Sequence, residues 1–168
     1  MTAPGQDAVT QALQQVLAAQ HAAVYGYPVI GVTLRSAGQI RLARQLEARH
    51  RHTRDELMAQ LAAHGVAPAP AEAGYRPAQP MAGPADAQRW ALDLEEDCAS
   101  AYRYLLVAPV LAVTGTSPGP TASGAPSAAE QASMRRQALA GLTTAALTAT
   151  QWRSLLSPST PTTPFPGL

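Results

Sequence analysis

The sequence predicts an all-α protein whose four helices form a bundle. Four segments carry apolar residues at the 3.6-residue spacing of amphipathic helices, and none shows the alternation typical of a half-buried strand. The breaks between these segments are rich in proline and glycine. The chain has 168 residues, the size of one domain. We assign residues 1–156 to the bundle and residues 157–168 to an extended, proline-rich tail that packs on it.

The first two predicted helices are separated by a short turn near Ser36. The first helix spans Gln6 to Leu34 and contains Pro28, which lacks a backbone N–H and is expected to kink or break the helix. The second helix spans Ala37 to His64. Its end is indicated by the sequence HGVAPAP, in which a glycine is followed by prolines that cannot continue a helix.

Two long connectors precede the other two helices. Residues 66–84 form the first connector, which is long enough to run the length of a bundle, and the third helix then spans Pro84 to Val107. The second connector, residues 109–126, is rich in glycine, proline, serine and threonine and is expected to be mobile. The fourth helix begins at Ser127, where Ser127 and Glu130 predict a capping box, and ends at Leu156.

The composition excludes several classes of function. The formal net charge is +1, all twelve basic residues are arginines, and the charges are interspersed. This pattern lacks the basic patch that binds nucleic acids or anionic membranes. The first residues do not resemble a signal peptide, and no window is apolar enough to span a bilayer. Cys98 is the single cysteine, so no intrachain disulfide can form, and we expect a cytoplasmic protein.

Polar residues interrupt the apolar stripes of the predicted helices at one level. Gln20 lies at the centre of the stripe of the first helix, and His50 lies inside the stripe of the second. If these helices form an antiparallel hairpin, Gln20 faces the region of His50. An unsatisfied buried polar group is unfavourable by roughly 1–3 kcal/mol. We therefore expect a core network of Gln20 and His50, with Tyr102 or Glu95 as a further partner.

This pattern resembles the ferritin-like superfamily, whose di-iron members place a glutamate on each of two helices and a Glu-x-x-His pair on each of the other two. In the sequence EARH, Glu47 and His50 match such a pair. Glu95, or less well Glu96, matches a lone glutamate, and Gln20 occupies the place of another. The fourth helix has no matching pair. The resemblance implies two antiparallel helix pairs joined by a long crossover, with an incomplete set of iron ligands.

More closely, the chain resembles a bacterial family of ferritin-like domains of unknown function. The resemblance rests on QHAAVYGY, HRHTRDEL and LEEDCASAYRYL in the first three helices and on PFPGL at the end. In that family the first motif commonly has glutamate in place of Gln20, and the second commonly has arginine in place of Thr53. The resemblance implies a fold and no established activity. It favours a tail anchored on the bundle by Phe165; the alternative is a tail that binds a partner or a second subunit.

Two interpretations of Glu47, His50 and Glu95 remain open. Together they could bind one iron or zinc ion, because carboxylate and imidazole groups suit both metals. Alternatively, Glu47 is solvated and His50 is a core residue beside it. A complete dinuclear centre is not expected, because Gln20 is neutral and the fourth helix supplies no carboxylate to bridge two ions.

The sequence therefore favours a protein that is not an enzyme and holds no cofactor. We predict a role in binding, assembly or regulation, through an unidentified protein or small-molecule partner, with a homodimer formed by helix burial between copies. The alternative is a metal-dependent oxidoreductase with a reduced set of iron or zinc ligands, in which Tyr102 supports the ligands. A third hypothesis is a small-molecule pocket at the polar layer between the helices.

Overall fold

The computed structural model describes the backbone of residues 4–114 and 127–157. Over these residues it contains four α-helices and no strand: α1 (Pro4–Thr33), α2 (Ala37–Ala63), α3 (Pro84–Thr114) and α4 (Ala128–Leu156). The all-helical prediction is confirmed for this part of the chain. None of its helices is both long and apolar enough to cross a bilayer. The predicted tail with Phe165, and residues 115–126, lie outside the described residues.

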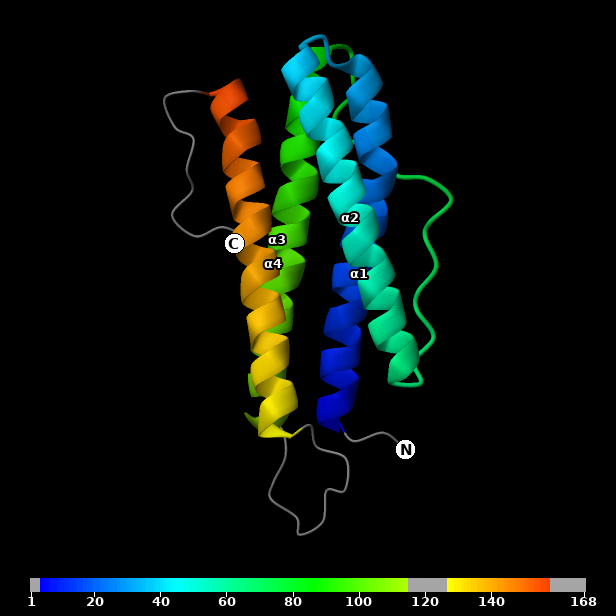
Figure 1. Cartoon of the computed structure of the whole chain (residues 1–168), viewed down its shortest axis with the longest axis vertical. Coiled ribbons are helices and arrows are strands. Elements are labelled where there is room, and N and C mark those ends of the chain that lie inside the picture. Colours follow the sequence, from blue (N-terminus) through cyan, green and yellow to red (C-terminus); the bar gives the residue numbers. More distant parts are fainter. Residues whose placement is uncertain (1–3, 115–126, 158–168) are drawn as a thin grey trace.

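The four helices pack side by side and leave one edge open (Figure 1). α1 packs against α2 and α3, and α4 packs against α3. Within the described ranges, no Cα atom of α2 lies within 8 Å of a Cα atom of α4. These two helices run antiparallel to each other (Figure 1). Their side chains, and not their backbones, meet across the open edge.

The segment that joins α2 to α3 runs back along the outside of α1. α2 and α3 begin at the same end of the molecule, so this segment must return the length of α2 (Figure 1). Gln14 of α1 donates a hydrogen bond to the Ala67 carbonyl and accepts one from the Ala69 N–H, both at 2.8 Å. Tyr25 packs against Tyr75 with ring centroids 5.5 Å apart. These contacts fix the connection on α1.

Local signals set two of the helix ends. The Ser127 hydroxyl accepts from the Glu130 N–H at 3.2 Å, and the Glu130 carboxylate accepts from the Ser127 N–H at 2.7 Å. This is the predicted capping box. Beyond α2, Gly65 has a φ of 70°, which side chains rarely allow, and the Val66 N–H bonds to the Leu61 carbonyl at 3.0 Å. The glycine stop read from the sequence therefore ends α2.

One expected helix end is wrong, and one expected break does not occur. α1 continues through Pro28 to Thr33, close to its predicted end at Leu34 and without a break. Its neighbours Tyr27 and Ile30 are fully buried, and this tertiary packing outweighs the lost hydrogen bond of one proline. α3 does not end at Val107 but extends to Thr114, so the first part of the second predicted connector is helical.

A polar layer lies between the two larger apolar clusters of the core. Gln20, His50 and Glu95 lie at the same level on α1, α2 and α3, with exposed fractions of 1%, 5% and 0%. The large side chains of the cluster on one side include Val16, Leu17, Leu57, Leu61 and Leu105. Those of the cluster on the other side include Tyr27, Ile30, Leu46, Trp90 and Trp152. The fold therefore places three polar side chains between two regions that exclude water.

Candidate functional site

A chain of hydrogen bonds begins on α4 and reaches the centre of the polar layer. The Trp152 indole N–H donates to the Tyr27 hydroxyl at 3.2 Å, and this hydroxyl donates to Glu95 Oε1 at 2.5 Å. Trp152 is on α4, Tyr27 on α1 and Glu95 on α3. A single hydroxyl group therefore connects three helices.

The chain continues from Glu95 to α2 and back to α1. His50 Nε2 lies 3.0 Å from Glu95 Oε1, and His50 Nδ1 lies 2.7 Å from Gln20 Oε1. The Gln20 amide N–H in turn donates to Cys98 Sγ at 3.6 Å. All four helices are thus connected by one continuous network, which is the kind of buried polar arrangement that fixes helix register.

His50 is held on both sides of its ring. Because the Gln20 oxygen can only accept, Nδ1 carries a hydrogen and donates it. Nε2 faces Glu95 Oε1, and a hydrogen bond between these two atoms requires one proton, which is bound either to the imidazole or to the carboxyl group. The Tyr27 ring stacks on the imidazole with centroids 5.4 Å apart and planes 17° apart. Both ring nitrogens are therefore engaged within the protein.

Glu95 is fully buried, and only one of its two oxygens is used. Oε1 accepts from Tyr27 and His50, and the Arg49 guanidinium Nη2 lies 3.9 Å from it. Oε2 is buried and accepts no hydrogen bond from any described residue. A buried acceptor without a partner is unfavourable by roughly 1–3 kcal/mol. Oε2 is therefore a buried acceptor with unused hydrogen-bonding capacity.

The environment keeps the phenol and the thiol of the network protonated. Burial, followed by the charge of Glu95, raises the pKa of the Tyr27 hydroxyl well above its usual value. Burial also raises the pKa of the Cys98 thiol, with further contributions from Glu95 and Asp97. Because the thiolate and not the thiol is the nucleophile, Cys98 is not set up for nucleophilic chemistry.

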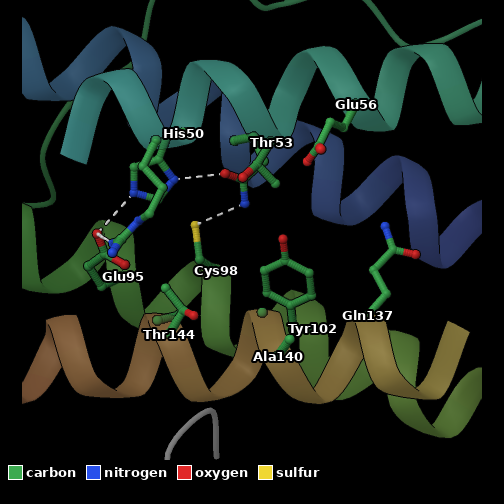
Figure 2. Close-up of a pocket in the computed structure, with 13 residues that line it drawn as sticks. His50, Thr53, Glu56, Glu95, Cys98, Tyr102, Gln137, Ala140 and Thr144 are labelled. Atoms are coloured by element: carbon green, nitrogen blue, oxygen red, sulfur yellow. Dashed lines mark hydrogen bonds and ion pairs between the residues drawn. The ribbon is translucent and has the colours of Figure 1, made fainter. Parts of the chain in front are cut away.

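A cavity of about 240 Å³ lies beside the polar layer, between α2 and α4 (Figure 2). The lining side chains are Arg49, His50, Thr53 and Glu56 from α2, Gln137, Ala140, Gly141, Thr144 and Ala145 from α4, and Gln20, Glu95, Cys98 and Tyr102 from α1 and α3. Glu56 and Thr144 are exposed to solvent, so the cavity reaches the surface at the open edge. Its inner end is formed by the polar layer.

Two polar bridges close the ends of this cavity. At one end Arg49 Nη2 donates to the Thr148 hydroxyl at 2.8 Å. At the other end Gln60 and Gln137 exchange side-chain hydrogen bonds at 3.4 and 3.0 Å. Arg49 and Gln60 are eleven positions apart, as are Gln137 and Thr148. Eleven helical residues span about 16 Å, which is therefore the distance between the bridges along the helices.

Small residues of α4 give the cavity its width. A Cβ atom on Gly141 would lie 2.3 Å from the Tyr102 ring, so glycine is required for this ring to pack against α4. Ala140 and Thr144 continue the wall on either side of it (Figure 2). Larger side chains at these positions would occupy the space between α2 and α4.

The structure brings together two of the three predicted metal ligands. His50 and Glu95 are in contact, whereas the Glu47 carboxylate pairs with Arg51. In the part of the chain that the structure describes, no group of three His, Cys, Asp or Glu side chains is placed to hold a metal ion.

Of the predicted network, Gln20 and His50 are hydrogen bonded. Tyr102 instead lines the cavity, and its hydroxyl bonds to none of the described residues.

Sequence reasoning missed Tyr27, Trp152 and Arg49 as members of this site. Tyr27 lies seven residues after Gln20, two turns along the same face of α1, so its position carried a usable signal. Buried tyrosine and tryptophan also usually find a hydrogen-bond partner. Arg49 gave no such signal, because its position on the edge of α2 is that of an ordinary surface arginine.

The chain matches the protein family described as Domain of unknown function (DUF4439) over residues 12–113. It is also similar to a solved structure, described as the crystal structure of a conserved hypothetical protein, rv2844, from Mycobacterium tuberculosis. The two chains are 32% identical, the similarity covers 89% of this chain and 98% of that one, and the TM-score is 0.72. None of the curated proteins matches the chain.

Proposed function

The chain belongs to the DUF4439 family, whose description gives no activity, and we propose from its site that it is a non-catalytic binding domain. In this proposal the helices form a ferritin-like four-helix bundle whose di-iron site is degenerate. The cavity between α2 and α4 takes a small-molecule ligand, and ligand binding serves an assembly or regulatory role.

The arrangement of the helices supports a ferritin-like bundle. α1 and α2 are an antiparallel pair, α3 and α4 are a second pair, and one long connection runs along the bundle between them (Figure 1). A single long connection between two helix pairs is the ferritin-like connectivity.

The residues of the polar layer do not fit a dinuclear iron centre. Such a centre draws carboxylates from all four helices and a histidine from two of them. Here α1 contributes the neutral Gln20, and α4 faces the cavity with Ala140, Gly141 and Thr144. Both nitrogens of His50 are already hydrogen bonded. With one buried carboxylate, that of Glu95, the layer cannot neutralise and bridge two metal ions.

The observation that carries the binding function is the open edge between α2 and α4. A purely structural bundle would be expected to close this edge, since close packing stabilises the core. Here the two helices remain apart around a cavity with a polar inner end. Side-chain hydrogen bonds join α2 and α4 at both ends of this cavity, and a cavity framed in this way is suited to binding a ligand.

The test is a screen of small polar compounds by thermal shift, run on the wild type and on two threonine variants. Thr144→Leu places a larger side chain in the cavity, while Thr143→Leu makes the same change at the next position, which does not line it. We expect compounds that raise the melting temperature of the wild type and of Thr143→Leu but not of Thr144→Leu. Compounds that stabilise all three proteins equally would contradict binding in the cavity.

A second candidate function is the metal-dependent oxidoreductase, with Glu47, His50 and Glu95 as ligands of one iron or zinc ion. The unpartnered Oε2 of Glu95, next to His50, is the observation that favours it. It requires Glu47 to leave Arg51. Elemental analysis of untagged protein, purified without chelators, tests it. One metal per chain that His50→Ala removes, with helical content unchanged, would support this candidate; no metal in the wild type would exclude it.

A further inference from the structure

The size of the cavity suits a compact ligand. Its volume is about 240 Å³. Pockets for drug-sized ligands are larger, from about 300 to 1,000 Å³. A short aliphatic chain with one polar head is a compact ligand of the size that suits this space.

The chemistry of the inner end calls for a hydrogen-bond donor. Glu95 is fully buried, and its Oε2 accepts no hydrogen bond from the described residues. The other polar groups beside it, His50 and Gln20, are already bonded to one another. Of the groups at the inner end, Glu95 Oε2 is therefore the acceptor with unused capacity, and a ligand that satisfies it must carry an N–H or O–H group.

The charges around the cavity favour a cationic donor. Two carboxylates line it, Glu95 at the inner end and Glu56 at the surface, with Cys98 and Tyr102 between them (Figure 2). Arg49 is the lining guanidinium, and it is already bonded to Thr148 and lies 3.9 Å from Glu95 Oε1. An anionic ligand would meet both carboxylates, whereas a cation gains a charge-assisted hydrogen bond.

We propose that the cavity between α2 and α4 binds a small organic ammonium ion, a primary amine with a short apolar chain. Its ammonium group donates to Glu95 Oε2, and its chain lies along the wall formed by Ala140, Gly141 and Thr144. Glu56, whose carboxylate lies 3.2 Å from His52 Nε2, adds negative charge at the opening. This assignment rests on the proposed binding function and names the ligand class of that same cavity.

The proposal is tested with three probes of matched length: n-pentylamine, n-pentanol and pentanoate. Isothermal titration calorimetry measures their affinities for the full chain, in phosphate buffer because Tris is itself a primary amine. We expect the amine to bind about tenfold more tightly than the alcohol, the difference that a charge-assisted hydrogen bond provides. Pentanoate should bind most weakly of the three.

Two pairs of variants locate the site. Glu95→Gln should remove the preference for the amine, while Glu96→Gln, the same change at a carboxylate that pairs with Arg153 on the surface, should keep it. Thr144→Leu should weaken both the amine and the alcohol, and Thr143→Leu neither. If Glu95→Gln fails to fold, as judged by circular dichroism, Glu56→Gln replaces it and should reduce the amine preference in part.

The outcomes separate the ligand class from the binding function. Tighter binding of the alcohol or the carboxylate, still blocked by Thr144→Leu, would overturn the amine assignment and leave the cavity as a binding site. Amine binding that Glu95→Gln and Thr144→Leu leave unchanged would overturn the assignment to this cavity. If none of the three probes binds the wild type, the amine assignment is overturned as well. The compound screen then decides whether the cavity binds ligands at all.

Discussion

The hydroxyl of Tyr27 connects three helices through two buried hydrogen bonds. It accepts from Trp152 and donates to Glu95. Tyr27→Phe keeps the ring but leaves the buried Trp152 N–H without its acceptor and Glu95 with one donor fewer. We expect a loss of about 1–3 kcal/mol in the free energy of unfolding, measured by urea denaturation.

Tyr25→Phe is the matched control for this prediction. Tyr25 lies two residues earlier on α1, is 44% exposed and packs against Tyr75 through its ring. Removing its hydroxyl should change the stability by less than about 0.5 kcal/mol, as is usual at the surface. Equal effects of the two variants would mean that the Tyr27 hydroxyl carries no special share of the stability.

For individual residues, the sequence predicted which polar side chains lie in the core better than which atoms they bond to. Gln20 and His50 could be placed in the core because each interrupts an apolar stripe of clear helical spacing. Their hydrogen bond then followed from the need to satisfy buried polar groups. Tyr27 and Trp152 were missed because aromatic residues on an apolar face are consistent with simple packing. Which atom their polar ends reach depends on how α4 docks, and helical periodicity does not specify that.

On α4, Gly141 lies directly against the ring of Tyr102 of α3. A methyl group there would lie 2.3 Å from the Tyr102 ring, which is itself buried. Gly141→Ala therefore forces the ring or α4 to move, although alanine is the better helix former. We expect a net loss of about 1–3 kcal/mol, typical of an overpacked core, in the free energy of unfolding measured with urea.

The same substitution should have the opposite sign at Gly31 of α1. A Cβ atom there would meet only the Ala43 methyl group, at an ordinary 3.9 Å. Gly31→Ala should therefore stabilise the protein by about 0.5–1 kcal/mol through helix propensity alone. If Gly141→Ala were also stabilising, this result would contradict the close packing of the Tyr102 ring on α4.

The helices themselves were predictable because the relevant signals are local. The capping box at Ser127 and the glycine after α2 act within a few residues, and both were read correctly. The possible break at Pro28 did not occur, and the end of α3 was placed too early, at Val107; at both places a proline signal competes with tertiary packing. The sequence alone does not give the strength of that packing.

Across the whole molecule, the open edge between α2 and α4 makes a geometric prediction. A disulfide requires Cα atoms within about 7 Å of each other, and no Cα pair between the described parts of these helices is within 8 Å. The double variant Gln60→Cys, Gln137→Cys should therefore fail to form an intrachain disulfide under mild oxidation. A bismaleimide with a flexible spacer should join the same two positions, as seen by mass spectrometry.

Each single cysteine variant serves as the control, because it reports any reaction of the native Cys98, which is buried. Rapid and complete disulfide formation in the double variant would show that α2 and α4 close on each other in solution. The predicted homodimer and cytoplasmic location are also properties of the whole molecule. Both stay predictions, which sedimentation velocity and cell fractionation can test.

The wall of small residues on α4 has a consequence for how this protein could change over evolution. Ala140, Gly141 and Thr144 shape the cavity but are not part of the hydrogen-bonded network that connects the helices. Substitutions there could alter which molecules are accepted while the network stays intact. Relatives that share the polar layer could therefore differ in ligand, and α4 is the helix in which to look for that divergence.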